Sequence, residues 1–177
     1  MPANLFQGRC NMSQEKPNFI TNRTFDDVKR WKALRDKGWL RMTEEERKEW
    51  LGEMESTPSA ARGMYTHIDL NRVEKAVEAI SLRFNESGYG TKLNTKTNWT
   101  YRDTVTKADI ERYLNNISAL REFFIVFQDT PKAPNINAQL DYKLANDIEQ
   151  ILNDAYDIAD RLVRSRYYVG EIISGEV

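Results

Sequence analysis

The sequence predicts a mainly α-helical fold, an up-down bundle of three long helices preceded by a helical hairpin. Apolar residues recur at intervals of three and four in three long stretches, capping residues precede those stretches, and glycine or proline follows them. The widest stripe, from Tyr142 to Val169, includes Ile148 and Leu152 and is typical of a helix packed against two others. With 177 residues and 40% hydrophobic side chains, the chain is long enough to bury the core of one domain.

We expect an extended N-terminal arm over residues 1–21 and a single helical domain over residues 22–177. The domain divides into three parts, a helical hairpin (22–55), a three-helix core (68–170) and an extended C-terminal tail (171–177). The arm has no apolar periodicity, which indicates either a disordered leader or an arm that docks on a neighbouring chain.

The hairpin is predicted from its caps. Thr24 is the expected N-cap of the first helix, and Gly38 is its expected end. A second, short helix begins after Thr43, which forms an S/T-x-x-E capping box with Glu46. Three tryptophans are expected to meet where the two helices pack, namely Trp31, Trp39 and Trp50.

The three long helices are expected at residues 69–87, 107–127 and 142–169, and we expect the hairpin to lie across them. Thr106 is the expected N-cap of the second, with Asp109 three residues further on. A loop over Ser56 to Thr66 leads into the first of these helices. A short extended or β segment is expected near residues 91–100, because β-forming residues alternate there with polar ones. Pro131 and Pro134 keep the connection before the last helix from being helical throughout.

Composition excludes several classes of protein. The net charge of −1 gives no overall field for nucleic acid or an anionic membrane. No apolar run approaches the roughly 20 residues that cross a bilayer, and residues 1–20 do not have the pattern of a signal peptide. Cys10 is the only cysteine, so no internal disulfide is possible, and we expect a cytosolic origin.

No catalytic, cofactor-binding or metal-binding residues are predicted, and we expect no enzymatic activity. His67 is the only histidine, and with Cys10 it cannot build a zinc site of the usual type. Asp154, Asp157 and Asp160 are spaced like a carboxylate ladder for Mg²⁺. They lie mostly off the apolar stripe, so a solvated helix face is the favoured interpretation.

Six segments together resemble a known family. They are Trp31-Lys-Ala-Leu-Arg-Asp-Lys-Gly-Trp39, Met42-Thr-Glu-Glu-Glu-Arg-Lys-Glu-Trp-Leu51, Asp69-Leu-Asn-Arg-Val-Glu-Lys-Ala-Val77, Lys96-Thr-Asn-Trp-Thr100, Ala145-Asn-Asp-Ile-Glu-Gln-Ile-Leu152 and Tyr168-Val-Gly-Glu-Ile-Ile-Ser-Gly-Glu-Val177. In that order, over about residues 24–177, they resemble a helical module of tail- and baseplate-associated structural proteins of Firmicutes phages and prophages. The resemblance implies a virion component that works through contacts, and it implies no catalytic residues.

The expected function is therefore that of a phage tail or baseplate protein, made in the bacterial host cytoplasm and located in the virion. Its partners would be other tail or baseplate proteins, in multiple copies of a symmetric assembly that takes part in virion assembly or host attachment. The expected contact residues are Leu5, Phe6, Phe19 and Ile20 in the arm and Tyr167, Tyr168, Ile172 and Ile173 in the tail. The tail could instead fold back on its own bundle.

The alternative is a cytosolic regulatory or nucleic-acid-binding helical module. Basic residues between Lys29 and Arg41 lie close to tryptophans, a combination that contacts phosphates and stacks bases. Acidic residues 44–46 and Glu49 follow at once and cancel the local field, which makes nucleic acid the less favoured partner.

Overall fold

The computed structural model describes residues 15–54, 56–123, 127–135, 137 and 139–174, with side chains described as far as Ser165. These residues form six α-helices and no strand, which confirms the predicted all-α class. The helices are α1 (Phe25–Lys37), α2 (Glu44–Leu51), α3 (Ala60–Gly63), α4 (His67–Glu86), α5 (Lys107–Glu122) and α6 (Tyr142–Ser174), and a 3₁₀ turn, η1 (Trp39–Arg41), joins α1 to α2.

The caps lie where the sequence places them. Thr24, Thr43 and Thr106 each accept a hydrogen bond from the backbone N–H three residues on, and the acidic residue there bonds back to the cap. The same box occurs at Thr66, so α4 begins at His67, two residues earlier than expected. Gly38 ends α1 with a φ of 79°, which a residue with a Cβ rarely adopts.

Two predicted segments differ in the structure. The loop expected over 56–66 contains the short helix α3, and the expected tail is helical as far as Ser174 because α6 continues through Gly170. The helix expected over 107–127 ends at Glu122, and residues 124–126 lie outside the described part.

Helices α4, α5 and α6 run in the same direction, so the up-down arrangement that the sequence suggested is wrong. Arg72 pairs with Glu149, and eleven residues further along both helices Arg83 pairs with Asp160. Arg112 pairs with Glu74 near the start of α5, and the rings of Phe123 and Phe84 lie 6.1 Å apart near its end. Short loops would have forced antiparallel neighbours, whereas residues 87–106 and 123–141 are long enough to return along a helix of about 30 Å.

The first return connection lies along α4 in the reverse direction. Oγ1 of Thr91 lies 2.5 Å from Oγ of Ser81, and the backbone N–H of Trp99 donates to Asn71 at 2.7 Å. The residues expected to be extended or β therefore form no strand. They bond to side chains of α4 and α5, where no neighbouring strand is available to pair with them.

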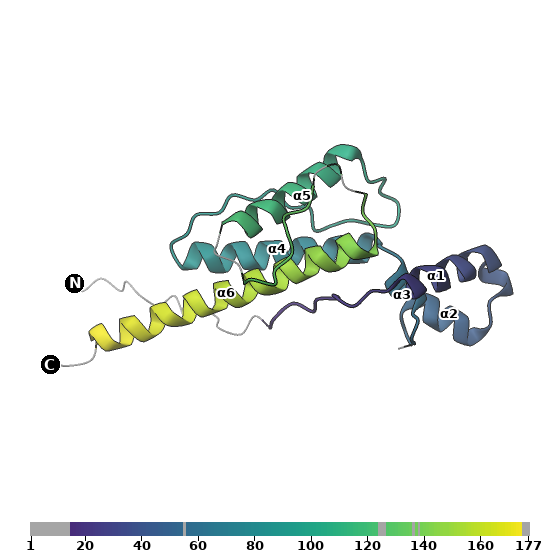
Figure 1. Ribbon diagram of the computed structural model, residues 1–177, viewed down its shortest axis with the longest axis horizontal. Coiled ribbons are helices and arrows are strands. Elements are labelled where there is room, and N and C mark those ends of the chain that lie inside the picture. The colour runs from purple at the N-terminus through teal and green to yellow at the C-terminus, as the bar shows by residue number, and fades with distance from the viewer. Residues whose placement is uncertain (1–14, 55, 124–126, 136, 138, 175–177) are drawn as a thin grey trace, which may run out of the picture.

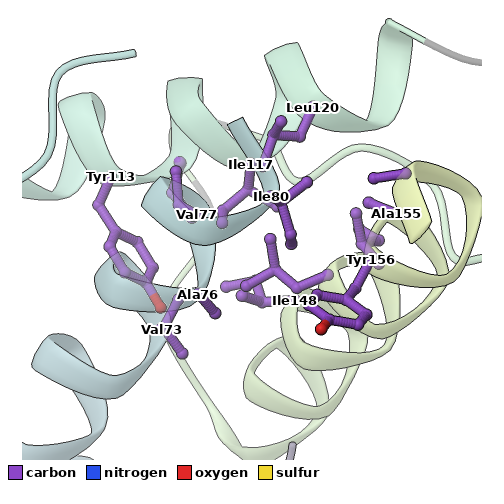
Figure 2. Packing of buried hydrophobic residues seen from close by; sticks show 14 of the residues in the cluster. Val73, Ala76, Val77, Ile80, Tyr113, Ile117, Leu120, Ile148, Ala155 and Tyr156 are labelled. Carbon is purple, nitrogen blue, oxygen red and sulfur yellow. The ribbon is translucent and has the colours of Figure 1, made fainter. Parts of the chain in front are cut away.

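A single apolar core lies between the three long helices. Figure 2 shows Val73, Val77 and Ile80 of α4 meeting Ile117 of α5 and Ile148 of α6, and all five are almost fully buried. The hydroxyls of Tyr65 and Tyr113 lie 2.5 Å apart at its edge, where burial raises the pKa of both. The core fixes the positions of the three helices relative to one another.

The hairpin helices α1, α2 and α3 form a separate lobe. Figure 1 shows them at one end of the bundle, next to the starts of α4 and α6, and not laid across it as expected. Leu34, Met42 and Ala60 form the small core of this lobe, with Trp31 and Trp50 packed against it. Trp39 does not join them: the residue is 46% exposed, and its ring lies beside the Arg47 guanidinium.

Residues 15–24 form an extended arm in the groove between α4 and α6. The Lys16 ammonium lies 2.6 Å from Asp157, and the backbone N–H of Arg23 donates to Asn146 at 3.0 Å, so the arm runs antiparallel to α6. Arg72 of α4 donates to the carbonyl of Asn18 from the other side. The arm thus connects the hairpin lobe to the middle of the bundle.

Candidate interaction surface

A cleft of about 550 Å³ separates the hairpin lobe from the three-helix core. Its walls come from α1, α3 and the turn after α3 on one side, and from residues 139–145 at the start of α6 on the other. The aromatic side chains that line it are those of Phe25, Trp31, Tyr65 and Tyr142. Such a concave, largely apolar surface between two lobes is a usual place for a ligand or a partner segment.

The hairpin wall is held in place by a close backbone approach. A Cβ at Gly63 would lie 2.1 Å from the carbonyl oxygen of Asp27, so α3 can lie against α1 only with glycine there. The carboxylate of Asp27 accepts from the backbone N–H of Ser59 at 2.6 Å. Burial by itself would raise the pKa of Asp27, but the bonds from Ser59 and Thr24 outweigh it and lower that pKa below its ordinary value.

A second carboxylate fixes α3 from α2. Glu49 is almost completely buried, accepts from the backbone N–H of Ala60 at 3.1 Å, and pairs with Arg30 of α1 at 2.7 Å. The Arg30 guanidinium lowers the pKa of Glu49, and this outweighs the opposite effect of burial. The three short helices therefore form one rigid wall despite their small apolar core.

The far wall meets the hairpin through aromatic rings. The ring centroids of Phe25 and Tyr142 lie 6.3 Å apart, within the range of favourable aromatic pairs. Asp141 accepts from the backbone N–H of Leu144 at 2.9 Å and so caps the start of α6. Phe25 is nevertheless 53% exposed, so this contact leaves apolar area open to a partner.

The charges in the cleft are mostly positive. Arg23 is buried and compensated by Glu149 and Asp69 at 2.8 and 3.1 Å. The remaining charged residues that line the cleft are Lys32, Arg62 and Asp141. Lys32 and Arg62 outnumber Asp141, and this small excess of positive charge favours a ligand that carries carboxylates.

A second apolar surface lies at the tip of the hairpin. Leu40 is 90% exposed and Trp39 is 46% exposed in the turn between α1 and α2. Neighbouring apolar side chains left open on a charged lobe are typical of a contact surface.

The residues predicted to contact a partner lie in several different places in the structure. Phe19 is partly buried against the chain's own core, and Ile20 donates its backbone N–H to Glu149, so both already contribute to the fold. Leu5 and Phe6 lie outside the described residues. The tail positions lie in α6, where the backbone is described but the side chains are not; they are Tyr167, Tyr168, Ile172 and Ile173.

The aspartates of α6 have separate partners. Asp154 is buried and accepts from the hydroxyl of Thr130 at 2.5 Å, Asp157 pairs with Lys16, and Asp160 pairs with Arg164 at 2.8 Å. Within the described part of the chain, no three His, Cys, Asp or Glu side chains come together in a way that could hold a metal ion. None of the described helices is long and apolar enough to cross a membrane.

The basic residues of the hairpin are largely paired with carboxylates. Lys29 pairs with Asp26, Arg30 with Glu49, and Lys37 with Glu46 at 2.5 Å. Arg35 pairs with Asp36, and its guanidinium also lies 5.0 Å from the centre of the Trp31 ring. These pairs reduce the positive field that a phosphate backbone would need.

The cleft was not predicted from the sequence, although one signal was present. Phe25 and Tyr142 are aromatic residues at the first positions of two helices far apart in the chain. Comparison of the chain with protein-family models, with curated proteins and with solved structures finds no match.

Proposed function

We propose that this protein is a structural component of a phage tail or baseplate and acts through protein–protein contacts rather than catalysis. The observation that carries the proposal is the cleft with aromatic lining between the hairpin lobe and the core, together with the exposed Leu40 and Trp39 at the tip of the lobe. We infer the kind of assembly, a phage tail or baseplate, from the resemblance of six segments to a helical tail-associated module. The place of action would be the virion tail, after synthesis in the host cytoplasm.

The buried charged residues are a second feature that suits a protein acting through contacts. Most of the buried charge is committed to holding the arm and the connections against the helices, as at Glu149, Glu74 and Asp27. A scaffold that keeps a rigid surface in place needs such internal bonds, whereas a catalytic site needs functional groups free to meet a substrate. The partners would be other tail or baseplate proteins present in several copies.

The test is to purify phage particles away from host protein by density gradient and to identify their proteins by mass spectrometry. The proposal predicts that the chain bands with the particles at a constant ratio to the tail proteins. A chain that is abundant in the lysate but missing from the particles would contradict it. A host cytosolic protein of similar abundance serves as the control for carry-over.

A further inference from the structure

The protein has two dissimilar ends. The cleft lies at the hairpin end, where α6 begins at Tyr142, and α6 then runs the length of the bundle away from it. Figure 1 shows the last turns of α6 extending past the end of α4 at the opposite end of the molecule. One end is therefore concave, and the other is a projecting helix.

The projecting segment cannot occupy the cleft of its own chain. Helix α6 contains 33 residues, which at about 1.5 Å per residue places its end roughly 50 Å from Tyr142. Because α6 starts in the wall of the cleft, residues 167–174 are carried away from it by the helix itself. Only the segment from another copy could reach the cleft.

The sequence of the segment is complementary to the cleft. Residues 167–177 read Tyr-Tyr-Val-Gly-Glu-Ile-Ile-Ser-Gly-Glu-Val, with two carboxylates, Glu171 and Glu176, and no cation. The cleft offers aromatic surface from Phe25 and Tyr142 and the cations Lys32 and Arg62. Tyrosine and isoleucine side chains beside carboxylates are what such a surface would recognise.

We propose that the C-terminal segment, residues 167–177, of one copy binds in the cleft between the hairpin lobe and the core of a second copy. This head-to-tail contact rests on the proposed function and names the contact by which copies assemble. Because the two surfaces differ, a pair of copies still has one free cleft and one free C-terminal segment, and repetition of the contact gives a ring or a filament. Multiple copies of a tail component would be ordered in this way.

Two variants of the full chain test the proposal. The cleft variant is Phe25→Glu with Lys32→Glu, which places two carboxylates at exposed helix positions in the cleft wall. The tail variant is Ile172→Asp with Ile173→Asp. The matched control is Ile68→Glu with Lys75→Glu, which makes the same kind of change at exposed positions of α4 outside the cleft.

Light scattering and sedimentation velocity measure the assembly of each variant, alone and in an equimolar mixture. We expect the wild type and the control to form species that grow with concentration, and each test variant alone to be monomeric, with affinity reduced at least tenfold. The mixture should give a one-to-one dimer and nothing larger, because it contains one intact cleft and one intact tail. An interface formed by identical surfaces would not be restored by mixing.

The proposal is overturned if the wild type stays monomeric at all concentrations, if either variant assembles like the wild type, or if the mixture stays monomeric. Circular dichroism checks that the variants are folded, and Lys32→Glu alone replaces the cleft variant if that one unfolds. A chain that is present in purified particles but fails these tests would contradict the head-to-tail contact and leave the structural role intact.

Discussion

The carboxylate of Glu149, fully buried on α6, accepts a hydrogen bond from the backbone N–H of Ile20 in the arm at 2.6 Å. The same relationship recurs at Glu74 with Lys96, at Asp27 with Ser59 and at Glu49 with Ala60. In each case a buried carboxylate on a helix holds a backbone N–H that lies outside a helix or at the start of one. These bonds attach the arm, the first return connection and α3 to the helical frame.

Replacement of Glu149 by alanine should therefore destabilise the whole protein. Arg23, which is buried, and Arg72, which is partly buried, would keep only Asp69 as a carboxylate partner, and loss of one member of a buried ion pair typically costs about 3–5 kcal/mol. Urea unfolding should show this loss in Glu149→Ala. Asp147→Ala, at an exposed position on the same helix, should stay within about 0.5 kcal/mol of the wild type. Equal stabilities for the two variants would contradict the role of Glu149.

Glu74→Ala should release the first return connection. Glu74 accepts from the backbone N–H of Lys96 at 2.7 Å and from the indole N–H of Trp99 at 3.2 Å, and it pairs with Arg112 at 2.6 Å. We expect faster hydrogen exchange at residues 94–99 and a shift of Trp99 emission to longer wavelength. Lys75→Ala, at the neighbouring exposed position of α4, provides the control. Exchange at 94–99 that is no faster in Glu74→Ala than in this control would refute the prediction.

Gly63→Ala should separate α3 from α1. The added methyl group would meet the Asp27 carbonyl at 2.1 Å, and relief of that overlap requires movement of backbone, with an expected loss of about 1–3 kcal/mol. At Gly90 a Cβ meets nothing within 4 Å, so Gly90→Ala is the matched control and should be close to neutral. Thermal unfolding of the two variants compares them directly, and a Gly63→Ala protein as stable as the control would show that α3 is not held this closely.

The hairpin lobe should lose stability in acid. The pKa values of Asp27 and Glu49 are lower in the folded protein than their ordinary values of 3.8 and 4.5. The unfolded chain therefore binds protons first as the pH falls, and the stability that these groups contribute, present above about pH 4.5, is lost below it.

Tryptophan fluorescence during urea unfolding at pH 7, 5, 4 and 3 measures this effect, because Trp31 and Trp50 pack in the hairpin core. Asp27→Asn should weaken the dependence below pH 4, since the amide does not titrate. A wild-type stability that stays constant from pH 5 to pH 3 would contradict the prediction.

The helix starts could be predicted because their causes are local. Thr24, Thr43 and Thr106 act on a residue three positions away, and that spacing is visible in the sequence. The apolar stripe of α6 likewise identified the buried residues Ile148 and Leu152, because helical periodicity decides which face meets the core.

The direction of the helices and the cleft depend instead on contacts between distant residues. The apolar pattern of a helix is the same whether its neighbour runs parallel or antiparallel, so the stripes of α4 and α5 left that choice open. It is decided by pairs such as Glu74 with Arg112, which the sequence presents as ordinary surface charges. Phe19 was expected to contact a partner for the same reason, since nothing local shows that the arm returns to its own core.

If the protein works in an assembly through its hairpin lobe, a charged residue at the tip of that lobe should impair its incorporation into particles, which a competition experiment measures. Wild-type chain and a Leu40→Asp variant are produced together during phage growth, and their ratio in purified particles is compared with their ratio in the lysate. Leu82→Asp, 48% exposed on α4, is the control. We predict that Leu40→Asp is depleted at least tenfold in the particles while the control is incorporated in proportion to its expression. Equal incorporation of both variants would contradict the claim.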